Sequence, residues 1–149
     1  MQLEVPPSQQ LPHHELEALI QLARLELRRG GEAHRAAALA YAERATERLE
    51  TVENVWRRLL GQIAVQRTRG LVDPGRSGEA ALSRLRALRA EAERRPYPLA
   101  VFEAELAMGE IEKSGLDPAS GRARLSSLAS RAAAAGFLSL SRRAEAAKS

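Results

Sequence analysis

The sequence contains no cysteine and very few aromatic residues. None of its 149 residues is Cys, and Trp, Tyr and Phe together make up 3%. The absence of cysteine excludes disulfide bonds, thiolate metal sites and cysteine nucleophiles, and it fits a reducing, cytoplasmic compartment. With so few aromatic residues, the core has to be built from Leu, Ala, Val and Ile, which suits closely packed helices better than a β-sheet.

Long hydrophobic runs and targeting signals are also missing. No apolar run approaches the roughly 20 residues that span a bilayer. The N-terminal stretch lacks the basic and apolar regions of a secretory signal. We therefore expect no membrane association. Residues 1–12 are interpreted as an N-terminal tail or linker, and a chain of this length predicts one domain.

Basic residues outnumber acidic ones, and nearly all of them are arginine. Lys and Arg number 23, of which 21 are Arg, against 19 Asp and Glu, giving a net charge of +4. A GC-rich coding bias would favour Arg and Ala together, whereas the functional alternative is an anion-binding surface.

The charges also fall in blocks along the chain. Residues 57–95 hold ten Arg and four acids, residues 96–121 hold five acids and one Lys, and residues 122–149 hold six bases and one acid. Blocks of opposite sign can pair between stacked helices. Alternatively, the basic middle block can take an acidic peptide or a phosphate backbone.

Glycine and proline divide the chain into segments with helical periodicity. Asp117-Pro118 places an N-cap before a proline at the first helical position, and Asp73-Pro74 or the later Ser77 offers a start for the fourth helix. Gly30 is placed to end a helix in the left-handed conformation, and Gly136 is expected to break the sixth helix. We expect seven helices in one repeat domain over 13–149: pairs at about 13–49, 51–95 and 96–135, and a capping helix at 137–147.

The third predicted helix carries two further expectations. Thr51 is the expected N-cap. Val52, Trp56, Leu59 and Ile63 lie at helical spacing on one face. We therefore expect Trp56 in the core rather than at a binding surface.

Two segments of the chain repeat each other. "GLVDPGRSGEAALSRL" at 70–85 and "GLDPASGRARLSSL" at 115–128 share their turn and the start of the following helix. The helices before the turns share a small residue at Ala23, Gly61 and Gly109. Gly inside a helix costs about 1 kcal/mol, so close helix approach is expected there. A period of about 40 to 48 residues is typical of stacked arrays, which predicts an all-α solenoid of antiparallel helix pairs.

The pattern of Leu22, Ala23, Leu25, Leu27 and Gly30 resembles the first helix of a tetratricopeptide repeat. Residues 102–147 resemble the C-terminal region of large bacterial regulators, in which a Ser/Thr kinase or winged-helix domain precedes such repeats. The matching pieces are Gly109-Glu110-Ile111-Glu112, Gly121-Arg122-Ala123-Arg124-Leu125, Gly136-Phe137-Leu138 and Arg142-Arg143. Neither a Gly-rich loop nor a kinase catalytic-loop motif is found in these 149 residues. The resemblance therefore implies a non-enzymatic module for protein binding, scaffolding or signalling.

In arrays of this kind, the first helix of each pair lines the concave face that binds a partner. The resemblance thus implies a set of polar residues on these helices as candidates for a partner groove. The alternative is that they form only a solvated helix face. The candidates are Glu17, Arg24, Arg28, Arg58, Gln62, Gln66, Glu103, Glu110 and Lys113.

No catalytic residue, cofactor or metal site is expected. His13 and Glu17 have a spacing that suits a metal, but neither an HExxH frame nor a cysteine accompanies them. The expected partner is a protein or peptide. Self-association into a homo-oligomer is one alternative. Nucleic-acid binding through the Arg-rich middle is a second, which is disfavoured because no aromatic residues interleave with the basic ones.

Overall fold

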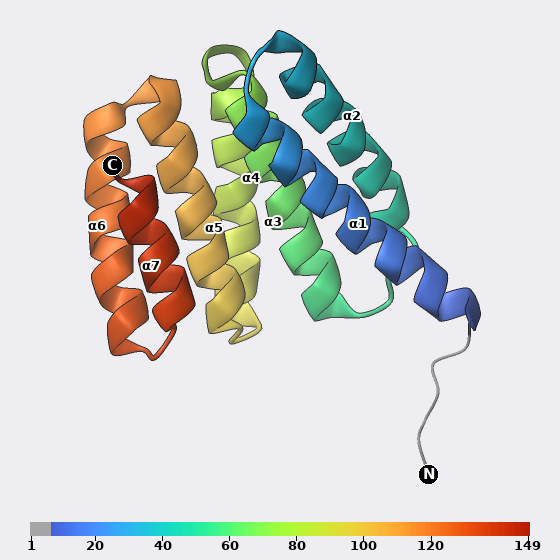
Figure 1. The fold of residues 1–149 in the computed structure, drawn as a ribbon. Coiled ribbons are helices and arrows are strands. Elements are labelled where there is room, and N and C mark those ends of the chain that lie inside the picture. The colour runs from blue at the N-terminus through green and yellow to red at the C-terminus, as the bar shows by residue number, and fades with distance from the viewer. Residues whose placement is uncertain (1–6) are drawn as a thin grey trace.

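The chain folds into a layered array of helices, seen here in a computed structural model that describes residues 7–149 and the side chains from His14 onward except Leu116. The described residues form seven α-helices, one π-helical turn and no strand (Figure 1). None of these helices is both long and apolar enough to span a bilayer. The all-α prediction is confirmed. The elements are α1 (Pro7–Arg29), α2 (Glu32–Leu49), α3 (Val55–Val72), α4 (Pro74–Arg94), α5 (Pro98–Ile111), η1 (Glu112–Leu116), α6 (Pro118–Ala134) and α7 (Leu138–Ala147).

The helices pack mainly as sequential antiparallel pairs. Helices α1, α3, α5 and α7 also contact one another in series, whereas α2, α4 and α6 pack against these alternate helices rather than against each other. The α1–α2 pair is tilted against the other helices, so the C-terminal half of α1 reaches across α3 toward α5 (Figure 1). This arrangement places α1, α3, α5 and α7 on one side of the molecule.

Three hydrophobic clusters form the core, and each draws on three consecutive helices. The first joins α1, α2 and α3 and includes Leu16 and Leu49. The second joins α3, α4 and α5 around Leu85. The third joins α5, α6 and α7 and includes Leu106 and Leu128. Helices α3 and α5 therefore belong to two clusters each, and every pair is buried against the next.

Local capping chemistry sets several helix ends as predicted. The Asp73 carboxylate accepts a hydrogen bond from the Arg76 backbone N–H at 3.2 Å, and Asp117 accepts one from the Ser120 N–H at 3.1 Å. A proline follows each of these caps at the first helical position. Gly30 and Gly136 have φ angles of 68° and 91°, which L side chains rarely adopt.

Three expectations about helix ends and the core are wrong. Helix α1 begins at Pro7, inside the segment 1–12 that was expected to be a tail, because proline suits a first helical turn. Thr51 is not the N-cap of α3: its hydroxyl donates to the Arg48 carbonyl at 2.7 Å, and Asn54 caps α3 instead. Trp56 is 41% exposed, since it lies in the first turn of α3 at the edge of the array.

The small residues at matched helix positions do allow close approach. A Cβ added at Gly61 would lie 2.5 Å from Leu49 Cδ2, and one at Gly109 would lie 2.7 Å from Leu125 Cγ. Ala23 is buried at the equivalent place on α1. Leucine side chains of α2 and α6 therefore fill the space that the two glycines leave.

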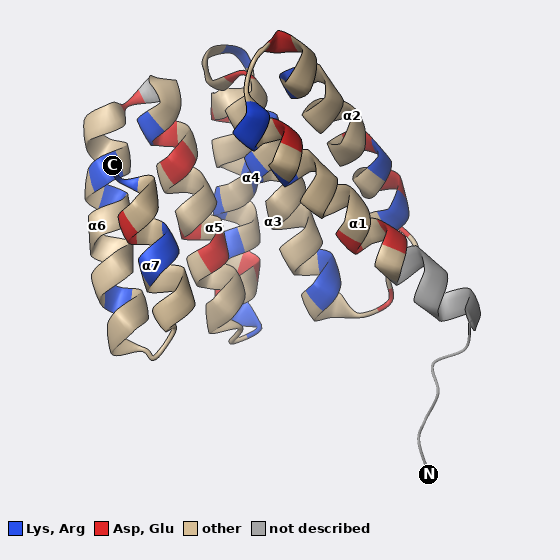
Figure 2. Ribbon diagram, viewed as in Figure 1, with Lys and Arg blue, Asp and Glu red and all other residues tan. Residues whose placement is uncertain are grey.

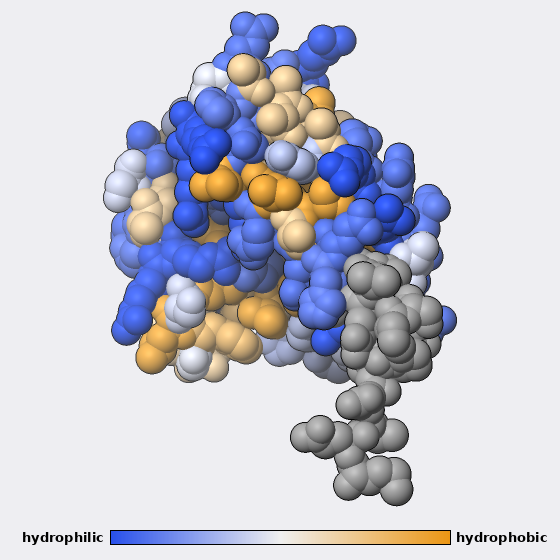
Figure 3. All heavy atoms as spheres, turned by 45° about the vertical axis from the view of Figure 1, so that its right-hand side comes forward, coloured by the Kyte–Doolittle hydropathy of each residue, from blue (hydrophilic) through white to orange (hydrophobic). Residues whose placement is uncertain are grey.

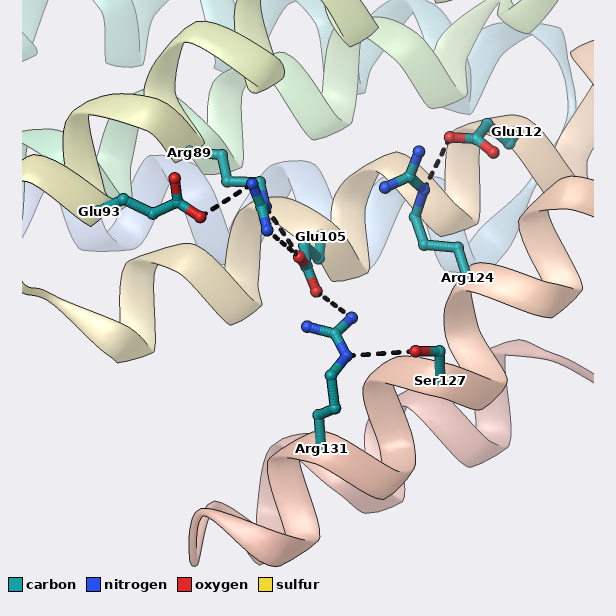
Figure 4. A network of polar contacts seen from close by, with 7 residues as sticks. All are labelled: Arg89, Glu93, Glu105, Glu112, Arg124, Ser127 and Arg131. Carbon is teal, nitrogen blue, oxygen red and sulfur yellow. Dashed lines mark hydrogen bonds and ion pairs between the residues drawn. The ribbon is translucent and has the colours of Figure 1, made fainter.

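Ion pairs between helices follow the predicted charge blocks. The acidic residues of α5 lie between basic residues of the preceding and following helices (Figure 2). The most buried of them is Glu105, which is 3% exposed and accepts from Arg89 on α4 and Arg131 on α6 (Figure 4). Glu112, two helical turns further along in η1, accepts separately from Arg124 Nε at 2.9 Å. The Arg89–Glu105 ion pair therefore joins two consecutive helix pairs, whereas the ion pairs of Arg131 and Arg124 hold α6 to α5 and η1.

The Glu105 network predicts a sharp difference between two conservative substitutions. Glu105→Gln leaves two arginines facing a neutral group, so we expect it to lower the free energy of unfolding by about 2 kcal/mol. Glu93→Gln removes only the exposed partner of Arg89 and should cost less than about 0.5 kcal/mol. Urea unfolding followed by circular dichroism measures both. Equal losses would show that the buried carboxylate has no special role.

Candidate ligand-binding groove

A groove opens on the side of the molecule formed by α1, α3, α5 and α7. Its larger part has a volume of about 460 Å³, and an adjoining part of about 140 Å³ shares Arg24, Arg67, Leu106 and Glu110 with it. Figure 3 shows a hollow with hydrophobic surface at its base, bordered by hydrophilic side chains. We name this feature the arginine groove. Its larger part is lined by Arg24, Leu27, Arg28, Gly30, Arg35, Arg67, Leu71, Leu106, Glu110, Ser114, Arg143 and Ala146.

Helical spacing brings these side chains to one surface. Arg24 and Arg28 lie four residues apart on α1, as do Arg67 and Leu71 on α3. Residues at this spacing share a helix face. Neighbouring positions on the same helices, such as Ala23 and Thr68, are buried in the core. The groove is therefore the outer face of helices whose other faces hold the array together.

Two bidentate ion pairs cross the groove. Arg67 on α3 donates to both carboxylate oxygens of Glu110 on α5, at 3.0 and 2.6 Å. Arg143 on α7 donates to both oxygens of Glu103, at 2.6 and 3.1 Å. Burial alone would lower the pKa of Arg143, but the hydrogen bonds to Glu103 and the charges of Glu103 and Glu110 outweigh it and raise that pKa. Paired forks of this kind hold their geometry well.

Arg24 is the exception among the half-buried arginines of the groove. It forms no ion pair with any residue between His14 and Ser149 whose side chain the structure describes. Burial lowers the pKa of Arg24, and the charges of Arg67 and Arg143 lower it further, against partial compensation by Glu103 and Glu110. A guanidinium stays protonated at neutral pH. The lowered pKa of Arg24 therefore reflects first its burial and second its closeness to two other cations.

The structure brings four of the candidate groove residues together and places the others elsewhere. Arg24, Arg28 and Glu110 line the larger part of the groove, and Glu103 lines the smaller part. Glu17 is exposed on α1 and Gln62 is half-buried on α3, and neither lines the groove.

Three further candidates have other positions. Arg58 donates to the Val52 carbonyl at 3.4 Å, which braces the connection before α3. Gln66 lines a separate depression between α2, α3 and α4. Lys113 donates to the carbonyl oxygens of Ala147 and Ser149 at 2.6 and 2.8 Å, so it holds the end of α7.

Sequence reasoning missed three arginines of the groove. Arg67 follows Leu60 by seven residues, and both line the groove, so a period drawn from Leu60 through Arg67 would have found this face. Arg143 lies on α7, which was expected only to cap the array. Arg35 lies near the start of α2, outside the set of first helices that was considered.

The other sequence features do not add a second chemistry to the groove. The structure does not describe the side chain of His13, so the metal spacing of His13 and Glu17 lies outside the described side chains. Across the side chains that are described, no group of three or more His, Cys, Asp or Glu is placed to hold a metal ion. No aromatic residue lines the described groove; Trp56 packs instead on Tyr97, with ring centroids 4.6 Å apart.

No protein family, curated protein or solved structure matches this chain. What the groove can bind is therefore inferred from the residues that line it. They offer cationic forks, two paired carboxylates and an apolar base, which together suit binding of an anionic segment with apolar neighbours.

The crowding of Arg24 predicts an unusual response to neutralisation. Arg24→Met keeps the aliphatic contacts and removes the repulsion from Arg67 and Arg143. We expect the free energy of unfolding to rise by about 0.5 kcal/mol at low salt, the scale of a partly exposed charge interaction. Urea unfolding at low and high salt measures the effect, which should shrink as salt screens it.

Arg86→Met on α4 is the matched control, because Arg86 is exposed and outside the groove. It should change the unfolding midpoint little in either buffer. If Arg24→Met instead lowers the free energy of unfolding, the repulsion from Arg67 and Arg143 does not dominate at this position.

Proposed function

We propose that this chain is a non-enzymatic docking module that holds a segment of a partner protein in the arginine groove. The observation that carries the proposal is that four alternate helices, α1, α3, α5 and α7, all contribute side chains to one continuous groove. A rigid, preformed surface of this kind loses little conformational entropy when a partner binds. Recognition of an extended or helical segment along a groove is a recurring mode of peptide binding.

The proposed architecture is a tetratricopeptide-like solenoid in the sensory or partner-docking part of a bacterial regulatory protein. Two features support it. Sequential helix pairs stack through helices shared between clusters, and alternate helices line one face, as they do in repeat arrays. The lack of cysteine supports a cytoplasmic setting.

The polar groups of the groove favour binding over chemistry. Both carboxylates are held in bidentate pairs with arginine, which keeps them as acceptors. The Ser114 hydroxyl donates to the Glu110 carbonyl at 2.7 Å, and among the side chains that the structure describes no histidine lines the groove to activate it. A nucleophile needs an adjacent base, so the groove offers contacts rather than a reaction.

A substitution that fills the groove without changing its charge tests the proposal. Ala64 is half-buried on α3 and lines the smaller part, so Ala64→Gln would occupy it. Peptides of twelve residues are selected on the wild-type chain from a random display library, and their dissociation constants are measured by calorimetry. We expect Ala64→Gln to weaken the selected peptides about tenfold or more, which is about 1.4 kcal/mol.

Ala87→Gln on the exposed face of α4 provides the control, since it adds the same side chain outside the groove. It should leave the dissociation constants unchanged. Selected peptides that bind Ala64→Gln as tightly as wild type would place the docking site somewhere else on the molecule.

One observation favours a second function, self-association through the outer face of α1. Leu22 and Leu25 are 38% and 43% exposed on that helix, and Leu39 on α2 is exposed as well. Large apolar side chains that gather on a surface mark interaction sites. A second copy of the chain could cover them.

Self-association predicts a molecular mass that rises with concentration. Static light scattering of wild type should show this rise, and the double variant Leu22→Glu/Leu25→Glu should remain monomeric. Gln21→Glu, an exposed neighbour on α1, controls for the added charge. A wild-type mass that is constant across the concentration range would exclude this function.

A further inference from the structure

The arginine groove contains more positive charge than its own carboxylates can balance. Among the described side chains, its larger part is lined by five arginines, Arg24, Arg28, Arg35, Arg67 and Arg143, and by one acid, Glu110, whereas Glu103 lies in the adjoining part. The two acids are each engaged by one arginine. Arg24, Arg28 and Arg35 are left with no ion pair to any residue whose side chain is described.

The position of Arg24 makes this surplus a site rather than a diffuse field. Arg24 lines both parts of the groove, is half-buried, and feels the charges of Arg67 and Arg143. Arg28 is one helical turn away, and Arg35 reaches the same cavity from α2. Placing a cation among cations is unfavourable unless a counter-charge arrives. An anion bound between these three side chains would supply it.

The number of charges distinguishes between kinds of anion. A carboxylate brings one negative charge and two acceptor oxygens. A phosphate monoester brings about 1.5 to 2 negative charges at neutral pH and three acceptor oxygens. Guanidinium forks match phosphate oxygens in bidentate geometry. A surplus of three cations is therefore better matched by a phosphate than by a single carboxylate.

The rest of the lining indicates what is attached to the phosphate. Leu27, Leu71 and Leu106 provide apolar surface beside the arginines. No aromatic residue lines the described groove, so stacking of a nucleobase has no platform. Aliphatic surface beside a cluster of arginines suits a peptide whose phosphorylated residue has apolar neighbours.

We propose that the arginine groove binds a partner segment carrying a phosphorylated serine or threonine, with the phosphate held by Arg24, Arg28 and Arg35. This inference rests on the docking function proposed above and names the chemistry of its ligand. The apolar residues at the base of the groove receive the side chains that flank the phosphorylated residue. Phosphorylation of the partner then controls docking, because the unmodified hydroxyl leaves the surplus charge unmatched.

Three matched peptide libraries test the proposal. Each consists of decapeptides with random flanking residues and a fixed central residue: phosphoserine, serine or glutamate. Retention on the immobilised chain is measured at physiological ionic strength. We expect the phosphoserine library to be retained at least about tenfold more than either twin. Inorganic phosphate should displace it more effectively than sodium chloride of equal ionic strength.

Variants of the chain separate a specific site from general attraction. Arg24→Gln should remove most of the preference for phosphoserine, whereas Arg86→Gln, which lowers the net charge equally outside the groove, should retain it. Circular dichroism and urea midpoints verify that both variants fold. A preference for phosphoserine that survives Arg24→Gln overturns the proposal in favour of non-specific electrostatic binding.

The remaining outcomes distinguish this inference from the docking function. Equal retention of the phosphoserine and serine libraries, both weakened by Ala64→Gln, leaves docking intact and overturns the phosphate chemistry. Glutamate peptides retained as well as phosphoserine peptides overturn it in favour of acidic peptides. If no library is retained but calorimetry shows that inorganic phosphate binds the chain, the peptide proposal is overturned and a small-anion site remains. If Ala64→Gln leaves the retention of every library unchanged, the docking function itself is overturned.

Discussion

Helices α3 and α5 are each buried in two of the three hydrophobic clusters, and the rest of the structure depends on this double burial. Residues of α3 contribute to the clusters on both of its sides, and residues of α5 do the same. A single helix pair has too little apolar surface to be stable alone, so stability comes from the contacts between pairs. Gly61 on α3 and Gly109 on α5 let leucines from α2 and α6 approach these two helices closely. The glycines lower intrinsic helix propensity, and the closer packing offsets that cost.

Double burial also decides where charged residues can lie. A helix with neighbours on two sides leaves only narrow strips of surface, and the acids on α5 occupy those strips. Glu103 and Glu110 face the groove, whereas Glu105 and Glu112 face α4 and α6. Each meets an arginine from another helix, so the ion pairs repeat the connectivity of the hydrophobic core. These acids are concentrated in one block of the sequence, so pairing between charge blocks could be predicted from the sequence alone.

Much of the fold could be predicted from sequence because the signals are local. Each Asp-Pro start, at Asp73-Pro74 and at Asp117-Pro118, depends on a hydrogen bond within four residues. Each helix end at Gly30 and Gly136 depends on the φ angle of one glycine. The repeat predicted the pairing of helices, and the small residues predicted the close contacts. Thr51 misled because a hydroxyl can serve the end of one helix as well as the start of the next.

The orientation of helices about their own axes was harder to predict, and the groove residues depended on it. Helix α3 is buried on several sides, so its apolar residues do not mark a single inward face. The face chosen from sequence contained Arg58, Gln62 and Gln66, whereas the groove receives Arg67. The prediction that Trp56 lies in the core was wrong for a related reason, because its apolar stripe continues past the point where the core ends. Periodicity specifies a stripe, but the neighbours that cover it are specified only by tertiary packing.

The two sides of the molecule differ in how completely their charges are balanced, and this difference distinguishes structure from function. Toward α4 and α6, Glu105 is shared by Arg89 and Arg131, and Glu112 is paired with Arg124. The Glu105–Arg89 pair joins two consecutive helix pairs, and the other two ion pairs hold α6 to α5 and η1. In the groove, each carboxylate is already engaged by one arginine. Glu103 and Glu110 offset the burial of Arg24 and the repulsion from Arg67 and Arg143 only in part, and neither forms an ion pair with Arg24 in the part of the chain that the structure describes. The described residues therefore balance the charge of Arg24 only in part, and a half-buried guanidinium favours a counter-ion that brings several oxygens at once.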